Sequence, residues 1–147
     1  MIISDIISLD RTECSVDCTS KKRIFETISE LAIMQSPQLD QAEILSSLLS
    51  REKMGSTGIG NGIAIPHGRI SGLSQVMAII ITTKQGIEFD AIDNKPVDIF
   101  FAILVPEHEA ETHLKALAGI ARKLNDKEIV KAIRKANTKK EIVLALS

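Results

Sequence analysis

A histidine held between a proline and a glycine is the residue of this sequence best suited to chemistry. His67 follows the apolar residues 63–65 and Pro66, and Gly68 comes directly after it. Proline fixes the backbone angle φ and glycine is permissive, so these neighbours favour a rigidly presented position at the edge of a sheet, where a short strand ends. A neutral imidazole is a nucleophile near neutral pH, because its ordinary pKa is about 6.5. His67 is therefore a candidate reactive residue, and a structural surface histidine is the alternative.

The segment before this histidine is rich in glycine. Residues 55–62 contain four of the eight glycines of the chain. The segment lacks the Gly-Lys-Ser/Thr ending of a P-loop, and its spacing differs from the G-x-G-x-x-G of dinucleotide-binding turns. Closely spaced glycines still allow backbone N–H groups to converge on an anion the size of phosphate. We therefore predict that Gly58, Gly60 and Gly62 bind phosphate, and a flexible surface loop is the alternative.

Arg51 and His113 are candidates for the same site. Arg51 stands at the end of a helical pattern directly before the glycines, where a guanidinium would stabilise a dianionic group. Basic residues are also common at helix C-termini for purely structural reasons. His113 lies at the start of an apolar-striped helix after the strongest strand, so we expect it at the rim of the site. His108 lies five residues before His113 and misses the spacing of a H-E-x-x-H metal site, so we expect a solvated loop residue.

The helices and strands that position these residues follow from apolar periodicity and capping residues. Helices are predicted from Ser20 to about Met34, from Asp40 toward residues 51–54, from Thr112 to Leu124, at residues 127–135 and after Thr138. Strands are predicted at residues 63–65, 76–83 and 97–105. Turns are predicted at Gly86, before residues 87–89, and at residues 93–94, with a strand end at residues 66–68 and extended or irregular chain at residues 5–18. Helices at both ends and strands in the middle predict a single-domain α/β sandwich spanning residues 1–147.

The composition excludes several classes of protein. With 147 residues, 44% hydrophobic and 25% charged, the chain resembles one ordinary globular domain, and its apolar stretches are too short to span a membrane. A net charge of -1 and the absence of tryptophan and tyrosine argue against nucleic-acid binding. The N-terminus has no secretory signal pattern. Cys14 and Cys18 lack the second pair of a zinc site, so we predict reduced thiols, no metal and a cytoplasmic protein.

Residues 55–68 resemble the active-site signature of the fructose/mannitol-type enzyme IIA domains of the bacterial phosphotransferase system. Within that family the sequence is most similar to the nitrogen-regulatory branch. Ser20-Lys21-Lys22-Arg23, residues 89–98 and Thr112-His113-Leu114 support the same match, so the resemblance covers nearly the whole chain. It implies a small mixed β-sheet flanked by helices.

The resemblance also implies a function. In this family the histidine that matches His67 accepts a phosphoryl group on a ring nitrogen from a small histidine-phosphorylated carrier protein. The residues that match His113 and Arg51 position and stabilise that group. We therefore expect a phosphotransferase enzyme component without a cofactor. Its expected partners are the donor carrier and regulatory target proteins, with no nucleic acid and no direct insertion into a membrane.

The sequence leaves one expected function and three alternatives. We expect a free-standing protein without an attached transport domain, and therefore one that regulates nitrogen, potassium or carbon metabolism according to its phosphorylation state. The alternative is a sugar-specific IIA subunit that passes phosphate to a separate IIB subunit of a fructose- or mannitol-type transporter. A second alternative is a binding module that carries no phosphate and in which His67 is structural. A hydrolase using His67 and His113 is a third, although the sequence shows no nucleophile or metal set for it.

Overall fold

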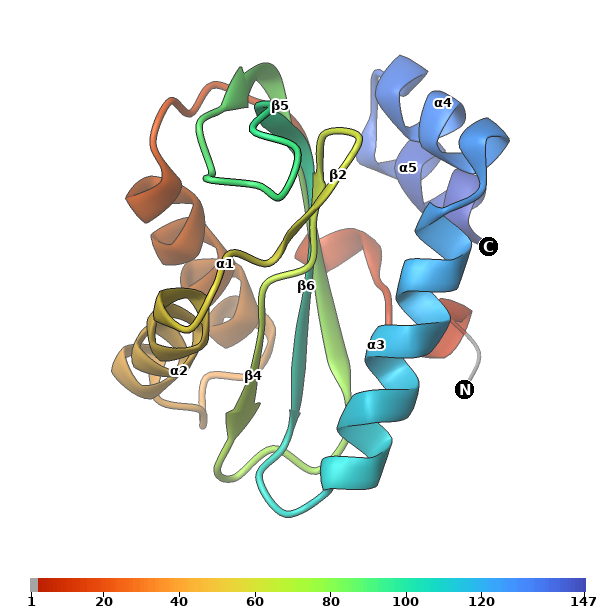
Figure 1. The fold of residues 1–147 in the computed structure, drawn as a ribbon. Helices are drawn as coiled ribbons and strands as arrows, with labels where there is room; N and C mark the ends of the chain where they lie inside the picture. The colour runs from red at the N-terminus through yellow and green to blue at the C-terminus, as the bar shows by residue number, and fades with distance from the viewer. Residues whose placement is uncertain (1–2) are drawn as a thin grey trace.

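A six-stranded β-sheet lies between two groups of helices in the computed structural model of this protein, which describes residues 3–147 (Figure 1). The strands are β1 (Thr12–Val16), β2 (Gly58–Gly60), β3 (Ile63–Ala64), β4 (His67–Ile70), β5 (Met77–Ile87) and β6 (Val97–Pro106). The helices are α1 (Lys21–Gln35), α2 (Gln41–Lys53), α3 (Ala110–Leu124), α4 (Lys127–Lys135) and α5 (Lys139–Leu146), and two short 3-10 turns, Ile3–Asp5 and Leu9–Arg11, precede β1. Helices α1 and α2 cover one face of the sheet, and α3, α4 and α5 cover the other. The predicted α/β sandwich with a mixed sheet is therefore confirmed.

Strand β6 organises the sheet. The strand order is β1-β5-β6-β3-β2, and β4 also pairs with β6. Strand β5 runs antiparallel to β6, whereas β3 and β4 run parallel to it along its opposite edge. The register places Ile63 beside Ile99 and His67 beside Ile103. The chain from β3 to β4 therefore follows the edge of β6 and brings His67 toward the end of the sheet from which α3 departs.

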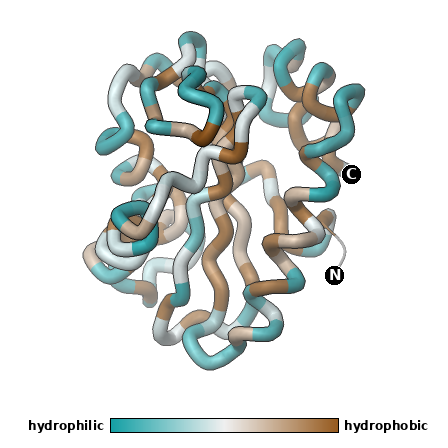
Figure 2. The backbone as a smooth tube through the Cα atoms, in the orientation of Figure 1, coloured by the Kyte–Doolittle hydropathy of each residue, from teal (hydrophilic) through white to brown (hydrophobic). Residues whose placement is uncertain are grey.

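Both faces of β6 are buried, which explains its continuous apolar sequence. Phe100, Ala102 and Leu104 pack into the core beneath α1 and α2. Phe101 and Ile103 pack into a second core beneath α3, α4 and α5. One strand supplies both cores because successive side chains of a strand point to opposite faces. Figure 2 shows this arrangement as hydrophobic strands at the centre, with hydrophilic residues on the outer surfaces of the helices.

Side-chain caps begin three of the helices where the sequence predicts them. The hydroxyl of Ser20 accepts a hydrogen bond from the backbone N–H of Arg23 at the start of α1. Asp40 caps α2 and Thr138 caps α5 in the same manner, so these predicted starts are confirmed. Within residues 3–147, no helix combines the length and the hydropathy needed to cross a bilayer.

The predicted start of α3 is wrong. The helix begins at Ala110 rather than after a capping Thr112, and the side chain of its N-cap residue Glu109 makes no capping hydrogen bond. The helix follows directly on β6, whose last residue is Pro106, and the backbone N–H of His113 already bonds to the carbonyl of Glu109. The connection from β6 therefore decides where this helix begins, and the local preference of threonine does not.

Gly86 also has a different role from the predicted turn. It lies within β5, which continues to Ile87, so no turn interrupts the strand at this glycine. A Cβ atom at Gly86 would approach the Cβ of Pro96 to 2.6 Å. Glycine is required here because two chain segments pass closely, since Ile87 pairs with Val97 at the start of β6.

The segment around His67 contains more strand than the sequence predicts. Residues 58–60 form β2 rather than a loop, and β3 ends at Ala64. Residues 66–68 were expected to stop a strand, but β4 begins at His67 and continues to Ile70. These short strands have little local signal, because they exist through their hydrogen bonds to β6 and to each other.

Candidate active site

His67 is buried at the start of β4, with 9% of the residue exposed. Its Nδ1 lies 2.8 Å from the carbonyl oxygen of Ile65, and its Nε2 lies 3.1 Å from Nε of Arg51. The guanidinium can only donate, so Nε2 must be the accepting nitrogen. The proton of the neutral ring is therefore on Nδ1, which donates to Ile65. This pairing leaves the lone pair, and with it the nucleophilic character of the ring, on Nε2.

Arg51 reaches this nitrogen from the last turn of α2. Its Nε donates to His67, and its Nη1 donates to the carbonyl oxygen of Gly55 at 2.8 Å. Helix α2 lies close enough to β4 for this contact because residue 68 is glycine. A Cβ atom on Gly68 would collide with Oγ of Ser47 and approach its Cβ to 3.2 Å. The glycine after His67 therefore permits the close helix–strand approach that joins arginine and histidine.

His113 approaches His67 from the opposite layer of helices, in the first turn of α3. The two ring centroids lie 5.1 Å apart, with the ring planes at 69°. The Nε2 atom of His113 is buried, and within residues 3–147 it has no hydrogen-bond partner. Buried polar atoms normally have such a partner. The structure thus brings His67, Arg51 and His113 together and leaves one buried nitrogen beside His67 available to a further group.

The pKa values of both histidines lie below the ordinary value. Burial lowers the pKa of His67, and the nearby Arg51 charge adds to this effect, against opposing contributions from the Ile65 carbonyl and Glu52. Burial also lowers the pKa of His113, assisted by the charges of His67, Arg69 and Arg51. A low-dielectric environment disfavours the charged imidazolium. Both rings are therefore held neutral near neutral pH, which is the state in which Nε2 of His67 has a lone pair.

The stability of the fold should therefore fall in mild acid. Both histidines have folded-state pKa values below 6.5, so the unfolded chain takes up protons first as the pH falls below that value. The resulting stabilisation is present above about pH 6.5 and is lost as the pH decreases toward the folded-state values. Urea unfolding at about pH 7.5 and about pH 5.5 would measure this loss. The double variant His67→Gln/His113→Gln should show a smaller loss, and an equal loss in both proteins would contradict the assignment.

The three glycines predicted to bind phosphate lie elsewhere. The N–H of Gly58 donates to the hydroxyl of Ser56, Gly60 adjoins Asp93, and Gly62 adjoins Asp98. Gly62 directly precedes Ile63, which pairs with Ile99, whereas His67 pairs with Ile103. The structure therefore does not bring these glycines to the imidazole of His67.

Gly60 and Gly62 belong to a hairpin. Asn61 and Gly62 have φ angles of 58° and 77°, and Gly60 pairs with Ile63 across them. Two central residues with positive φ are typical of a type I′ turn, for which Asn-Gly is the preferred sequence. The Asn-Gly pair was the signal in the sequence from which this hairpin could have been predicted.

Arg69 is a further cation near the site that the sequence analysis did not single out. It lies on β4 two residues after His67, and its charge lowers the pKa of His113. Residues two apart on a strand share one face, so this spacing is the signal from which Arg69 could have been found. His108, by contrast, is exposed in the turn before α3, as predicted.

The fold and the site together define a class of protein: an α/β domain with a buried histidine whose Nε2 lone pair faces an arginine, which suits the handling of a transferable anionic group. Residues 5–147 match the family model described as "Phosphoenolpyruvate-dependent sugar phosphotransferase system, EIIA 2", and the chain belongs to this family. The family predicted from the sequence is confirmed.

Individual relatives agree with the nitrogen-regulatory branch. The chain is 44% identical over 141 residues to the nitrogen regulatory protein of Escherichia coli (strain K12), covering 95% of this chain and 86% of that protein. It is 40% identical over 136 residues to the nitrogen regulatory protein of Pseudomonas aeruginosa, with 92% and 88% covered. Identity to the fructose-specific EIIA component of Haloferax volcanii is 31% over 140 residues, with 95% and 91% covered.

Solved structures agree on the architecture. The nitrogen regulatory protein IIA-Ntr of Neisseria meningitidis superimposes with a TM-score of 0.90 at 37% identity, covering 99% of both chains. The IIA mannitol structure from Escherichia coli superimposes with a TM-score of 0.78 at 15% identity, covering 96% of this chain and 99% of that one. The second likeness concerns the fold alone.

Proposed function

We propose that Nε2 of His67 accepts a phosphoryl group from a histidine-phosphorylated carrier protein and that the phosphorylation state of this chain regulates partner proteins. The observation that carries the proposal is the pair of hydrogen bonds on the ring, which places the proton on Nδ1 and the lone pair on Nε2, facing Arg51. Membership in the phosphotransferase EIIA family and similarity to nitrogen regulatory proteins support it. The proposed setting is the cytoplasm.

The transfer can be written with this chain's own residues. The lone pair of Nε2 attacks phosphorus as the N–P bond of the donor phosphohistidine breaks, and the electron pair of that bond stays with the donor imidazole. The proton on Nδ1 of His67 remains in its hydrogen bond to the Ile65 carbonyl, which favours the positive charge that the phosphorylated ring acquires. The two imidazoles therefore complete every bond change, and the proposed transfer needs no cofactor.

Arg51 has two successive tasks in this step. Its hydrogen bond to Nε2 must open before phosphorus can approach that nitrogen. The freed guanidinium then lies beside the incoming oxygens, and its planar arrangement of donors matches a phosphoryl group. The buried Nε2 of His113 is a second group available to contact these oxygens, provided that it holds the proton of its neutral ring.

A second candidate output is transfer to a IIB subunit of a fructose-type transporter. The observation that favours it is the similarity to the fructose-specific EIIA component of Haloferax volcanii. The greater identity to nitrogen regulatory proteins favours the regulatory output.

Mass spectrometry of the reconstituted relay would test the proposal. The purified protein would be incubated with phosphoenolpyruvate, an enzyme I and its histidine carrier, in separate nitrogen-type and sugar-type pairs. We expect a single added phosphoryl group that is labile in acid and does not pass to a fructose-type IIB protein. Rapid passage to IIB would favour the sugar-specific alternative. No added mass with either donor pair would contradict phosphoryl carriage and favour a binding module.

A further inference from the structure

Glu52 is a buried carboxylate directly after Arg51 that the site described above does not use. Its side chain is 6% exposed, although it belongs to the last turn of a surface helix. Its oxygens accept hydrogen bonds from the backbone N–H of Thr57 at 3.1 and 3.2 Å and from the Thr57 hydroxyl at 2.6 Å. They also form an ion pair with Nζ of Lys21 at 2.8 Å. A buried charge is tolerated only when it is paired in this way, so the arrangement is a specific one.

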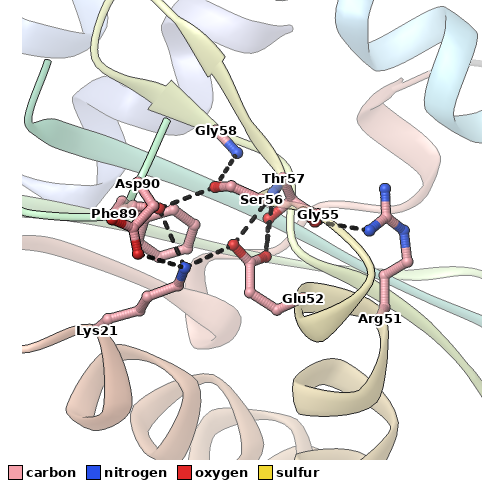
Figure 3. Close-up of polar contacts among 9 residues, drawn as sticks. All are labelled: Lys21, Arg51, Glu52, Gly55, Ser56, Thr57, Gly58, Phe89 and Asp90. Atoms are coloured by element: carbon pink, nitrogen blue, oxygen red, sulfur yellow. Dashed lines mark hydrogen bonds and ion pairs between the residues drawn. The ribbon is translucent and has the colours of Figure 1, made fainter. Parts of the chain in front are cut away.

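The same cluster joins four segments of the chain (Figure 3). Lys21, the first residue of α1, also donates to the carbonyl oxygen of Phe89 at 3.0 Å. The hydroxyl of Ser56 donates to that carbonyl at 2.9 Å and accepts from the N–H of Gly58 at 3.1 Å. The start of α1, the end of α2, the glycine segment and the segment after β5 are therefore held together around Glu52.

The hydrogen bonds between Glu52 and Thr57 close a loop of residues 52–57, and this loop contacts Arg51. Glu52 and Thr57 are bonded to each other, and Gly55 lies between them in the chain. The carbonyl oxygen of Gly55 accepts the Nη1 hydrogen bond of Arg51, whose Nε faces His67. Figure 3 shows Arg51 reaching the backbone of this loop beside the Glu52 cluster. Glu52 thus holds the loop whose Gly55 carbonyl orients the guanidinium of Arg51, although Glu52 makes no hydrogen bond to His67 itself.

We propose that Glu52 is a positioning residue for phosphoryl acceptance: by closing the loop of residues 52–57 onto Lys21 and Thr57, it holds the Gly55 carbonyl that aims Arg51 at His67. This inference rests on the proposed roles of His67 and Arg51. The lysine in the cluster balances the negative charge of Glu52. The guanidinium of Arg51 is therefore left to the histidine and to an incoming anion.

The charge of Glu52 provides a separate readout. Four charged or titratable groups surround the pair of histidine rings or belong to it. Arg51 and Glu52 from α2 act on His67, Arg69 from β4 acts on His113, and His113 from α3 lies against His67. Of these, Glu52 raises the pKa of His67, whereas Arg51 lowers it. Removing only the charge in Glu52→Gln should therefore lower the pKa of His67 and move the acid limb of phosphoryl acceptance to lower pH.

The test compares Glu52→Ala with Glu52→Gln in single-turnover phosphorylation by the phosphorylated carrier. Glu52→Ala should slow acceptance at saturating carrier by about tenfold to a hundredfold, because the guanidinium loses its fixed orientation. The carrier concentration at half-maximal rate should change little. Glu52→Gln retains an acceptor for Thr57 and should recover most of the rate. The matched control is Glu30→Ala, which removes an exposed ion pair with Arg23 and should leave the rate unchanged.

A double variant separates positioning from general structural damage. If Glu52 acts through Arg51, Glu52→Ala should slow acceptance no further in an Arg51→Ala background. An equal slowing in both backgrounds, or a single variant Glu52→Ala as fast as wild type, would overturn the inference. If Glu52→Ala does not fold, Thr57→Val against Thr57→Ser makes the same comparison at the other end of the loop. Failure of the proposed function would be distinct, because wild type itself would then carry no phosphate on His67.

Discussion

His67→Ala is expected to eliminate acid-labile phosphorylation of this protein completely. The substitution removes Nε2, the ring nitrogen whose lone pair faces Arg51 while Nδ1 is bonded to the Ile65 carbonyl. No other histidine in the described structure has both nitrogens directed in this way. Intact mass after incubation with phosphoenolpyruvate, enzyme I and the histidine carrier would measure the loss. Urea unfolding of the variant would establish that the fold persists.

His108→Ala is the matched control for this experiment. His108 is exposed in the turn before α3 and has no part in the hydrogen bond between His67 and Arg51, so full phosphorylation should remain. His113 is the competing acceptor, because its buried Nε2 lies beside the site without a partner in residues 3–147. A persistent acid-labile phosphate in His67→Ala that maps to His113 would show that the assigned acceptor is wrong.

Arg51→Ala should slow phosphoryl acceptance by about a hundredfold to a thousandfold without preventing folding. Removing one well-placed donor to a developing anionic charge typically has an effect of this size. Arg51→Lys should recover only part of the rate, since an ammonium group has the charge but not the planar donor pair that spans His67 and Gly55. Rapid-quench measurement of the single-turnover rate at saturating carrier would determine both values.

The pH dependence of the rate provides a second test of the role of Arg51. The charge of Arg51 lowers the pKa of His67, so Arg51→Ala should raise that pKa. The acid limb of the rate profile should then move to higher pH, opposite to the shift expected for Glu52→Gln. Arg122→Ala is the control, because Arg122 also lies in the last turn of a helix but is exposed on α3. Wild-type rates in Arg51→Ala would remove the arginine from the site.

The opposite shifts of the pH profile also distinguish a residue that contacts His67 directly from one that acts on it indirectly. Arg51 touches His67 directly, whereas Glu52 acts through the loop that contains Gly55 and through its charge. Direct contact explains the larger expected loss of rate for Arg51→Ala. The loop route explains why the effect of Glu52 should depend on the presence of Arg51.

Local patterns in the sequence determined much of this protein. The side-chain caps at Ser20, Asp40 and Thr138 were predictable because a cap is satisfied within a few residues of the chain. Strand β6 was predictable because burial on both faces leaves a long apolar run. The family and the candidate residues were recognisable from short stretches of sequence. Arg51 and His67 lie in or beside one continuous signature, and His113 lies near the start of a helix.

Only the tertiary structure decided how these residues meet. The proton on Nδ1 of His67, the contact of Arg51 with Nε2 and the approach of His113 all depend on where α2 and α3 pack against the edge of β6. The pairing of Glu52 with Lys21 joins two helices, and nothing in either segment alone predicts it. The position of Gly60 and Gly62 in the hairpin of β2 and β3, away from His67, is set by the pairing of β3 with β6. Local sequence encodes local hydrogen bonds, whereas the register along a central strand selects the distant groups that become neighbours.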